Sequence, residues 1–126
     1  MRYYALAIEA KSGNFQVLSR FLEKLGIEAL RVHALEDIWA MLDSGRKLSV
    51  AIIDVMGYGD VVRDTCRLLR EKNVPMLIIS PRDNSEYLRE GYGCGAKGVF
   101  KKPVVMRELA DCIRTLLPNE AQEQGA

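Results

Sequence analysis

The sequence has few of the residues that mark disulfide-rich or metal-binding proteins. Its 126 residues include three cysteines and one histidine, and no two cysteines have a Cys-X-X-Cys spacing. We therefore expect neither a disulfide framework nor a zinc site, and this cysteine content is typical of a cytoplasmic protein. Cys66 and Cys112 fall on the predicted apolar faces of helices, where a thiol packs as a small hydrophobic side chain.

An excess of charge of one sign and long hydrophobic runs are also lacking. The net charge is +1, which gives no electrostatic reason to expect binding to nucleic acid or to a membrane surface. No apolar run approaches the roughly 18 residues of a membrane-spanning helix, and the N-terminus lacks the layout of a signal peptide. Because 48% of the residues are hydrophobic, we expect one domain, residues 1–118, followed by a polar tail, 119–126.

Apolar runs rich in β-branched residues alternate along the chain with segments of helical periodicity. The runs predict strands at 3–8, 27–32, 48–54, 74–79 and 98–100. The periodic segments predict helices at 15–25, 35–44 and 60–72, a poorer one opening near Asp83, and one at 105–117. This alternation requires right-handed crossovers. The sequence therefore predicts an α/β fold, a single doubly wound domain with a five-stranded parallel sheet and five helices.

Four polar residues directly follow or end strands of this sheet: Glu9, Asp54, Ser80 and Lys102. The carboxyl ends of parallel strands meet at one edge, where open α/β sheets bind ligands. Two carboxylates, a hydroxyl and an ammonium there suit a phosphoryl group: Asp54 would attack phosphorus, and Lys102 would bind the product oxygens. Mg²⁺ held by carboxylates and a backbone carbonyl would neutralise the developing charge. The alternative is that each residue is a polar strand end that meets solvent.

Five segments occur in a characteristic order and spacing: Ala7-Ile8-Glu9, Phe21-Leu22-Glu23-Lys24-Leu25-Gly26, Ile52-Ile53-Asp54, Ile78-Ile79-Ser80 and the segment from Gly95 to Pro103. Through them the chain resembles, over residues 3–117, the receiver domains of bacterial two-component response regulators. The resemblance implies a flavodoxin-like sheet with strand order 2-1-3-4-5.

The resemblance also implies a role for several residues. Asp54 would be the phosphate-accepting aspartate, Ser80 the switch hydroxyl and Lys102 the lysine that contacts the phosphoryl group. Glu9, Asp54 and the backbone carbonyl of Met56 would hold Mg²⁺. The peptide bond between Lys102 and Pro103 would be cis, as is typical of the family.

The first departure from the family pattern concerns the metal. The family has two adjacent acids after the first strand, and here the pair reads Glu9-Ala10. Ala10 has no oxygen ligand to offer, so we expect weaker binding of Mg²⁺, which relies on few carboxylates. The ammonium of Lys11 is a candidate to replace part of the metal's charge.

Further departures affect the switch. Pro81 restricts the loop after Ser80, because proline fixes its own φ and disfavours a helical conformation in the preceding residue. Val99 occupies the place of the family's rotating aromatic residue, and Phe100 should point to the opposite face of the sheet. Tyr58, between two glycines, either covers the site or lies exposed in its loop.

These observations leave two related functions open. The first is a phosphoacceptor, not an enzyme, that receives a phosphoryl group on Asp54 from a histidine kinase or phosphotransfer protein. The second is a degenerate receiver that binds partners without phosphorylation, which Ala10, Pro81 and Val99 favour. In receivers, the face of the fourth helix and fifth strand commonly forms a homodimer or contacts an output partner. Here that face carries the charged and aromatic residues Arg82, Tyr87, Arg89 and Tyr92. The alternative is that these residues form a solvated surface that binds no partner.

Two ligand-binding relatives of this topology fit the sequence less well. A flavin-binding protein needs a hydroxyl- and glycine-rich phosphate cradle, which the loop 9–15 lacks. A cobalamin-binding protein needs a histidine after an early strand, and His33 is not at the required place. We expect His33 to be a surface residue.

Overall fold

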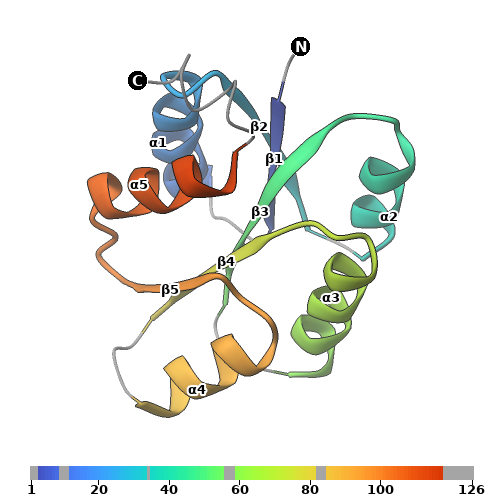
Figure 1. Cartoon of the computed structure of the whole chain (residues 1–126), viewed down its shortest axis with the longest axis vertical. Helices are drawn as coiled ribbons and strands as arrows, with labels where there is room; N and C mark the ends of the chain where they lie inside the picture. Colours follow the sequence, from blue (N-terminus) through green and yellow to red (C-terminus); the bar gives the residue numbers. More distant parts are fainter. Residues whose placement is uncertain (1–2, 9–11, 34, 56–58, 82–84, 118–126) are drawn as a thin grey trace.

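The computed structural model describes residues 3–8, 12–33, 35–55, 59–81 and 85–117, in which strands and helices alternate (Figure 1). The strands are β1 (Tyr3–Ile8), β2 (Ile27–Val32), β3 (Leu48–Asp54), β4 (Met76–Ser80) and β5 (Gly98–Lys101). The helices are α1 (Ser12–Glu23), α2 (Leu35–Asp43), α3 (Asp60–Glu71), α4 (Ser85–Gly93) and α5 (Met106–Leu116). The predicted α/β alternation is confirmed.

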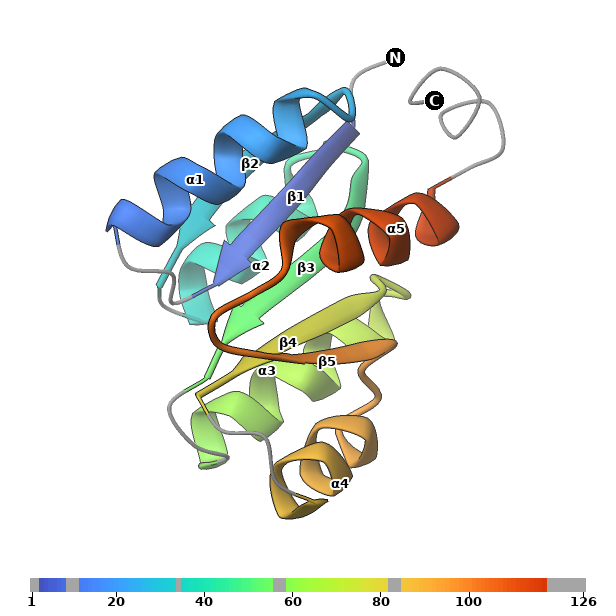
Figure 2. The same ribbon diagram turned by 90° about the vertical axis from the view of Figure 1, so that its left-hand side faces the viewer.

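All strand pairs are parallel, and the strand order is β2-β1-β3-β4-β5, as predicted. The order turns back at β1 and β3, so that helices cover both faces of the sheet. Figure 1 shows α1 and α5 on one side of the strands and α2 and α3 on the other, and Figure 2 shows α4 next to β5 at the end of the sheet.

Each face of the sheet has its own apolar core. Ile52 of β3 packs with residues of α1 and α5, whereas its neighbour Ile53 packs with residues of α2 and α3. Adjacent residues of a strand point to opposite faces, so an uninterrupted apolar run is what a strand buried on both sides requires. The prediction that residues 48–54 form such a strand is confirmed.

Several expectations concern single residues. Cys66 is buried and Cys112 half-buried, each against apolar neighbours, as expected. The last helix was predicted to begin at Val105, but this is wrong: Val105 precedes the first turn of α5 and is 54% exposed. Asp83 and the tail 119–126 lie outside the described residues. In the part of the chain that is described, no helix is long and apolar enough to span a membrane.

Candidate functional site

The carboxylate at the end of β3 is almost fully buried and forms an ion pair. Asp54 is 8% exposed, because its strand lies between β1 and β4 and its backbone pairs with Ile79. The ammonium Nζ of Lys102, the residue after β5, lies 2.9 Å from Asp54 Oδ1. The Lys102 side chain is about one-third exposed, which lets its stem run along the protein while its charged end reaches the carboxylate.

Backbone hydrogen bonds hold the ends of three strands together at this edge. The N–H of Val55 donates to the carbonyl of Ile79 over 3.0 Å, and the N–H of Lys102 donates to the carbonyl of Ser80 over 3.0 Å. Ser80 is the last residue of β4 and is 1% exposed, because β4 lies between the strands that lead to Asp54 and Lys102. The peptide bond from Lys102 to Pro103 is cis, as the resemblance implied.

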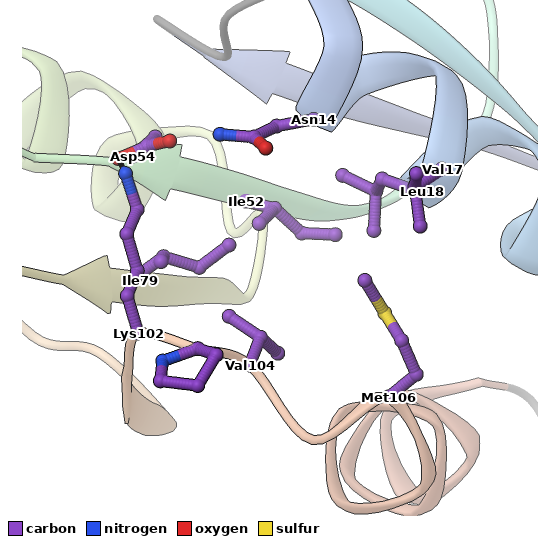
Figure 3. A pocket seen from close by; sticks show the side chains of 10 residues that line it. Asn14, Val17, Leu18, Ile52, Asp54, Ile79, Lys102, Val104 and Met106 are labelled. Carbon is purple, nitrogen blue, oxygen red and sulfur yellow. Dashed lines mark ion pairs between the residues drawn. The ribbon is translucent and has the colours of Figure 1, made fainter.

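A cavity of about 240 Å³ adjoins the ion pair, between the start of α1 and the segment leading into α5. Its walls are mostly apolar and include Leu18, Ile52 and Met106. Figure 3 shows Asp54 and Lys102 at one end, with the Asn14 side chain extending from α1 toward Asp54. Asn14 was not among the predicted site residues; its place between the predicted first strand and the helix at 15–25 was the available signal that it borders the sheet edge.

Several predicted site residues cannot be located relative to Asp54. Glu9, Ala10 and Met56 lie outside the described residues, as do Lys11 and Tyr58. Within the described ranges, no group of three or more histidine, cysteine or acidic residues is arranged to hold a metal ion. His33 lies exposed just after β2, as expected.

The face formed by α4 and β5 is partly apolar. Tyr92 is 53% and Leu88 37% exposed. A cavity of about 260 Å³ includes Ser80, Leu88 and Val99 in its lining. Phe100 packs in the core of α1 and α5 and Val99 in the other core, so the two neighbours do face opposite sides of the sheet.

Comparison with known proteins gives a structural likeness only. No family model matches the sequence, and no curated protein matches it significantly. A two-component response regulator from Clostridium difficile superposes with a TM-score of 0.78 at 17% identity, over 94% of this chain and 98% of the other. A chemotaxis response regulator of Vibrio cholerae gives 0.75 at 21% identity, over 93% and 100%. A pilus-assembly-related protein from Burkholderia pseudomallei gives 0.73 at 19% identity, over 100% and 92%.

The strand order and the helices on both faces define a flavodoxin-like doubly wound α/β protein. Within that class, the fold is that of response-regulator receiver domains, as the superpositions over nearly the whole of both chains show.

Proposed function

We propose that this protein is a receiver that accepts a phosphoryl group on Asp54 from a phosphohistidine of a histidine kinase or phosphotransfer protein. The observation that supports this most directly is the 2.9 Å contact between Lys102 Nζ and Asp54 Oδ1 at the carboxyl edge of the sheet. A carboxylate beside an ammonium at this edge offers both a nucleophile and the start of an anion site.

The proposed reaction exchanges one bond to phosphorus for another. A carboxylate oxygen of Asp54 forms the P–O bond while the P–N bond to the donor histidine breaks, and the imidazole nitrogen keeps that electron pair. Lys102 would then contact the phosphoryl oxygens instead of the carboxyl group, because in the acyl phosphate the negative charge lies on the phosphoryl oxygens. The partly exposed Lys102 side chain has room for this small displacement.

The donor chemistry at this edge suits Mg²⁺. The carboxylate of Asp54, which Lys102 contacts through Oδ1, offers hard oxygen donors. Hard oxygen donors are what Mg²⁺ prefers. Asp54, Glu9 and the backbone carbonyl of Met56 would hold the ion, which would neutralise charge on the transferring group. Because Ala10 supplies no second acid, we expect this binding to be weak.

Phosphorylation would act through Ser80 and the segment that leads to α4. An acyl phosphate adds negative charge and acceptor oxygens next to Ser80, and such a change biases a neighbouring loop. The output would be a change in partner binding or homodimerisation at the face of α4 and β5. We place the protein in the cytoplasm, and propose for it no catalysis on a diffusible substrate.

A degenerate receiver that binds partners without phosphorylation is the second candidate. The same ion pair supports it, since Lys102 already satisfies the buried carboxylate without a phosphoryl group. Ala10, Pro81 and Val99 are the residues that favour it.

The two candidates differ in intact mass after incubation with a small phosphodonor and Mg²⁺. We expect the wild type to gain one phosphoryl group and Asp54→Asn to gain none. Asp111→Asn is a matched control, because Asp111 is an exposed acid on α5, and it should gain one group as the wild type does. No gain in the wild type, from the small donor or from a phosphorylated histidine kinase, would leave the degenerate receiver.

A further inference from the structure

Two thiols meet on the side of the molecule away from α1 and α5. Cys66 is buried on α3, and Cys94, directly after α4, is half-buried. Both line a groove of about 460 Å³ between α3 and the end of α4, and Cys94 packs against the apolar core that contains Cys66. The thiol of Cys94 is close enough to Cys66 to help raise its pKa, although burial is the larger cause.

The backbone around Cys94 is well held. The N–H of Cys94 donates to the carbonyls of Glu90, over 3.0 Å, and Gly91, over 3.2 Å. The next residue, Gly95, lies directly under the side chain of Arg70: a Cβ added to Gly95 would come within 2.7 Å of Arg70 Cδ. Cys66 and Arg70 are one turn apart on α3 and so share a face of the helix. Two residues on one face of α3, Cys66 and Arg70, therefore lie against two consecutive residues after α4, Cys94 and Gly95.

We propose that Cys66 and Cys94 are a peroxide oxidation site that closes to an intramolecular disulfide. This inference is independent of phosphorylation at Asp54. Disulfides in a reducing compartment are usually transient and redox-sensing, so the proposal does not conflict with the lack of a disulfide framework.

The reaction has two balanced steps. Cys94, the more exposed thiol, attacks hydrogen peroxide as its thiolate, which breaks the O–O bond and gives a sulfenic acid and hydroxide. The Cys66 sulfur then attacks the Cys94 sulfur, forming the S–S bond and expelling the second hydroxide. The two thiol protons convert both hydroxides to water. The two sulfurs have then given two electrons to the peroxide.

The surroundings of the two thiols favour the first step and slow the second. Its lining includes three arginines and one acid: Arg63, Arg67, Arg70 and Glu90. The guanidinium groups would stabilise the hydroxide that leaves. Burial, and secondarily the neighbouring Cys94, raises the pKa of Cys66 to about 12, while Arg70 acts in the opposite direction. Because burial disfavours the thiolate of Cys66, closure should be faster at higher pH.

A disulfide at this place would join α3 covalently to the end of α4. Apart from Gly91, the described residues Glu86–Gly93 of α4 are exposed or only half-buried, so this helix has few apolar anchors of its own. Cross-linking the two segments also restricts the unfolded chain. We expect oxidation to raise the unfolding temperature and to slow amide exchange near Cys94.

The test uses the reduced wild-type chain and hydrogen peroxide. After oxidation, unfolding and alkylation, we expect a mass loss of two hydrogens and a single alkylated thiol, Cys112. A non-reducing digest should contain the peptide pair joining Cys66 and Cys94. Cys112→Ser is the matched control and should still form the disulfide with no thiol left to alkylate, and Asp54→Asn should behave as the wild type does.

Other outcomes would overturn the proposal. These are a sulfinic acid on Cys94 with Cys66 still open to alkylation, a disulfide joining Cys94 of two molecules, or three thiols that all remain reduced. Because these assignments come from wild-type peptides, they do not depend on whether a variant at the buried Cys66 folds. In the supporting outcome, Cys94→Ser forms no intramolecular disulfide and Cys66 remains alkylatable.

Discussion

Helices α4 and α5 are neighbours of the same strand, β5, yet the protein holds them in different ways. In α5, Leu109 and Ile113 are fully buried against the sheet, and Leu117 continues this buried face just past the helix. In α4, none of the side chains described is a buried apolar one, and Leu88 is 37% exposed. Segments with few buried apolar contacts open at a lower free energy than core elements.

The difference assigns separate tasks to the two helices. Lys102 precedes α5, so a firmly packed α5 fixes the stem from which the ammonium reaches Asp54. Helix α4 follows Ser80 along the chain, so under the proposed function a weakly held α4 would change position when Asp54 is phosphorylated. The proposed function requires both properties: a rigid site and an element that responds to it.

The largest expected effect comes from removing an anchor of α5. Ile113 is 0% exposed, and truncating a buried isoleucine to alanine removes apolar contacts and leaves a cavity. We expect Ile113→Ala to lower the free energy of unfolding by about 2–5 kcal/mol in urea titrations. The comparison variant, Leu88→Ala on α4, should cost less than about 1 kcal/mol.

Similar losses in these two variants would contradict the contrast between the helices. A large loss in Leu88→Ala alone would mean that α4 is anchored through the cavity that Leu88 lines near Ser80.

This contrast was only partly visible in the sequence. Helical periodicity correctly predicted a last helix within 105–117, and the helix opening near Asp83 was correctly predicted as the poorer one. The spacing of apolar residues within a helix is enough to predict how well that helix is anchored, because each helix packs against a single face of the sheet. The predicted start of the last helix at Val105 was one residue early, because Val105 is apolar at a helical spacing but adopts an extended conformation before the first turn.

The proposed sites were also only partly predictable from the sequence. Parallel topology predicted that Asp54, Ser80 and Lys102 would share an edge, because strand ends can be read from the apolar runs. The contact of Cys66 with Cys94 could not be predicted in this way. It joins residues on two helical segments, and depends on how α4 turns into β5 around Gly95 with its φ of +98°. The available sequence signal was the Gly-Cys-Gly run at 93–95, which predicts a turn but does not indicate that the turn packs against α3.

An intermediate effect is expected at that turn. Gly95 adopts a positive φ, and a side chain there is strained and also meets Arg70. We expect Gly95→Ala to reduce the free energy of unfolding by about 1–2 kcal/mol. Gly93→Ala, two residues away with open space around its Cβ position, should cost nothing or stabilise slightly. Thermal denaturation of the two proteins makes the comparison.

The Arg70→Ala background separates the two causes at Gly95. If backbone strain dominates, the cost of Gly95→Ala should remain in that background, because the strain does not depend on Arg70. A cost that disappears would show instead that the contact with the arginine side chain controls how α3 and the end of α4 fit together.

The smallest expected effect concerns the ion pair between α3 and α4. Arg63 and Glu90 lie 3.9 Å apart, and their side chains are 57% and 37% exposed. Water and salt screen such a pair, so a double-mutant cycle with Arg63→Met and Glu90→Gln should give a coupling below about 0.5 kcal/mol. A coupling above about 1 kcal/mol that weakens in salt would mean that charge holds α4 in place. If the coupling is this small, the main attachment of α4 to α3 is the contact that Cys94 and Gly95 make with α3. Closing the disulfide there should therefore restrain α4 more than breaking the ion pair releases it.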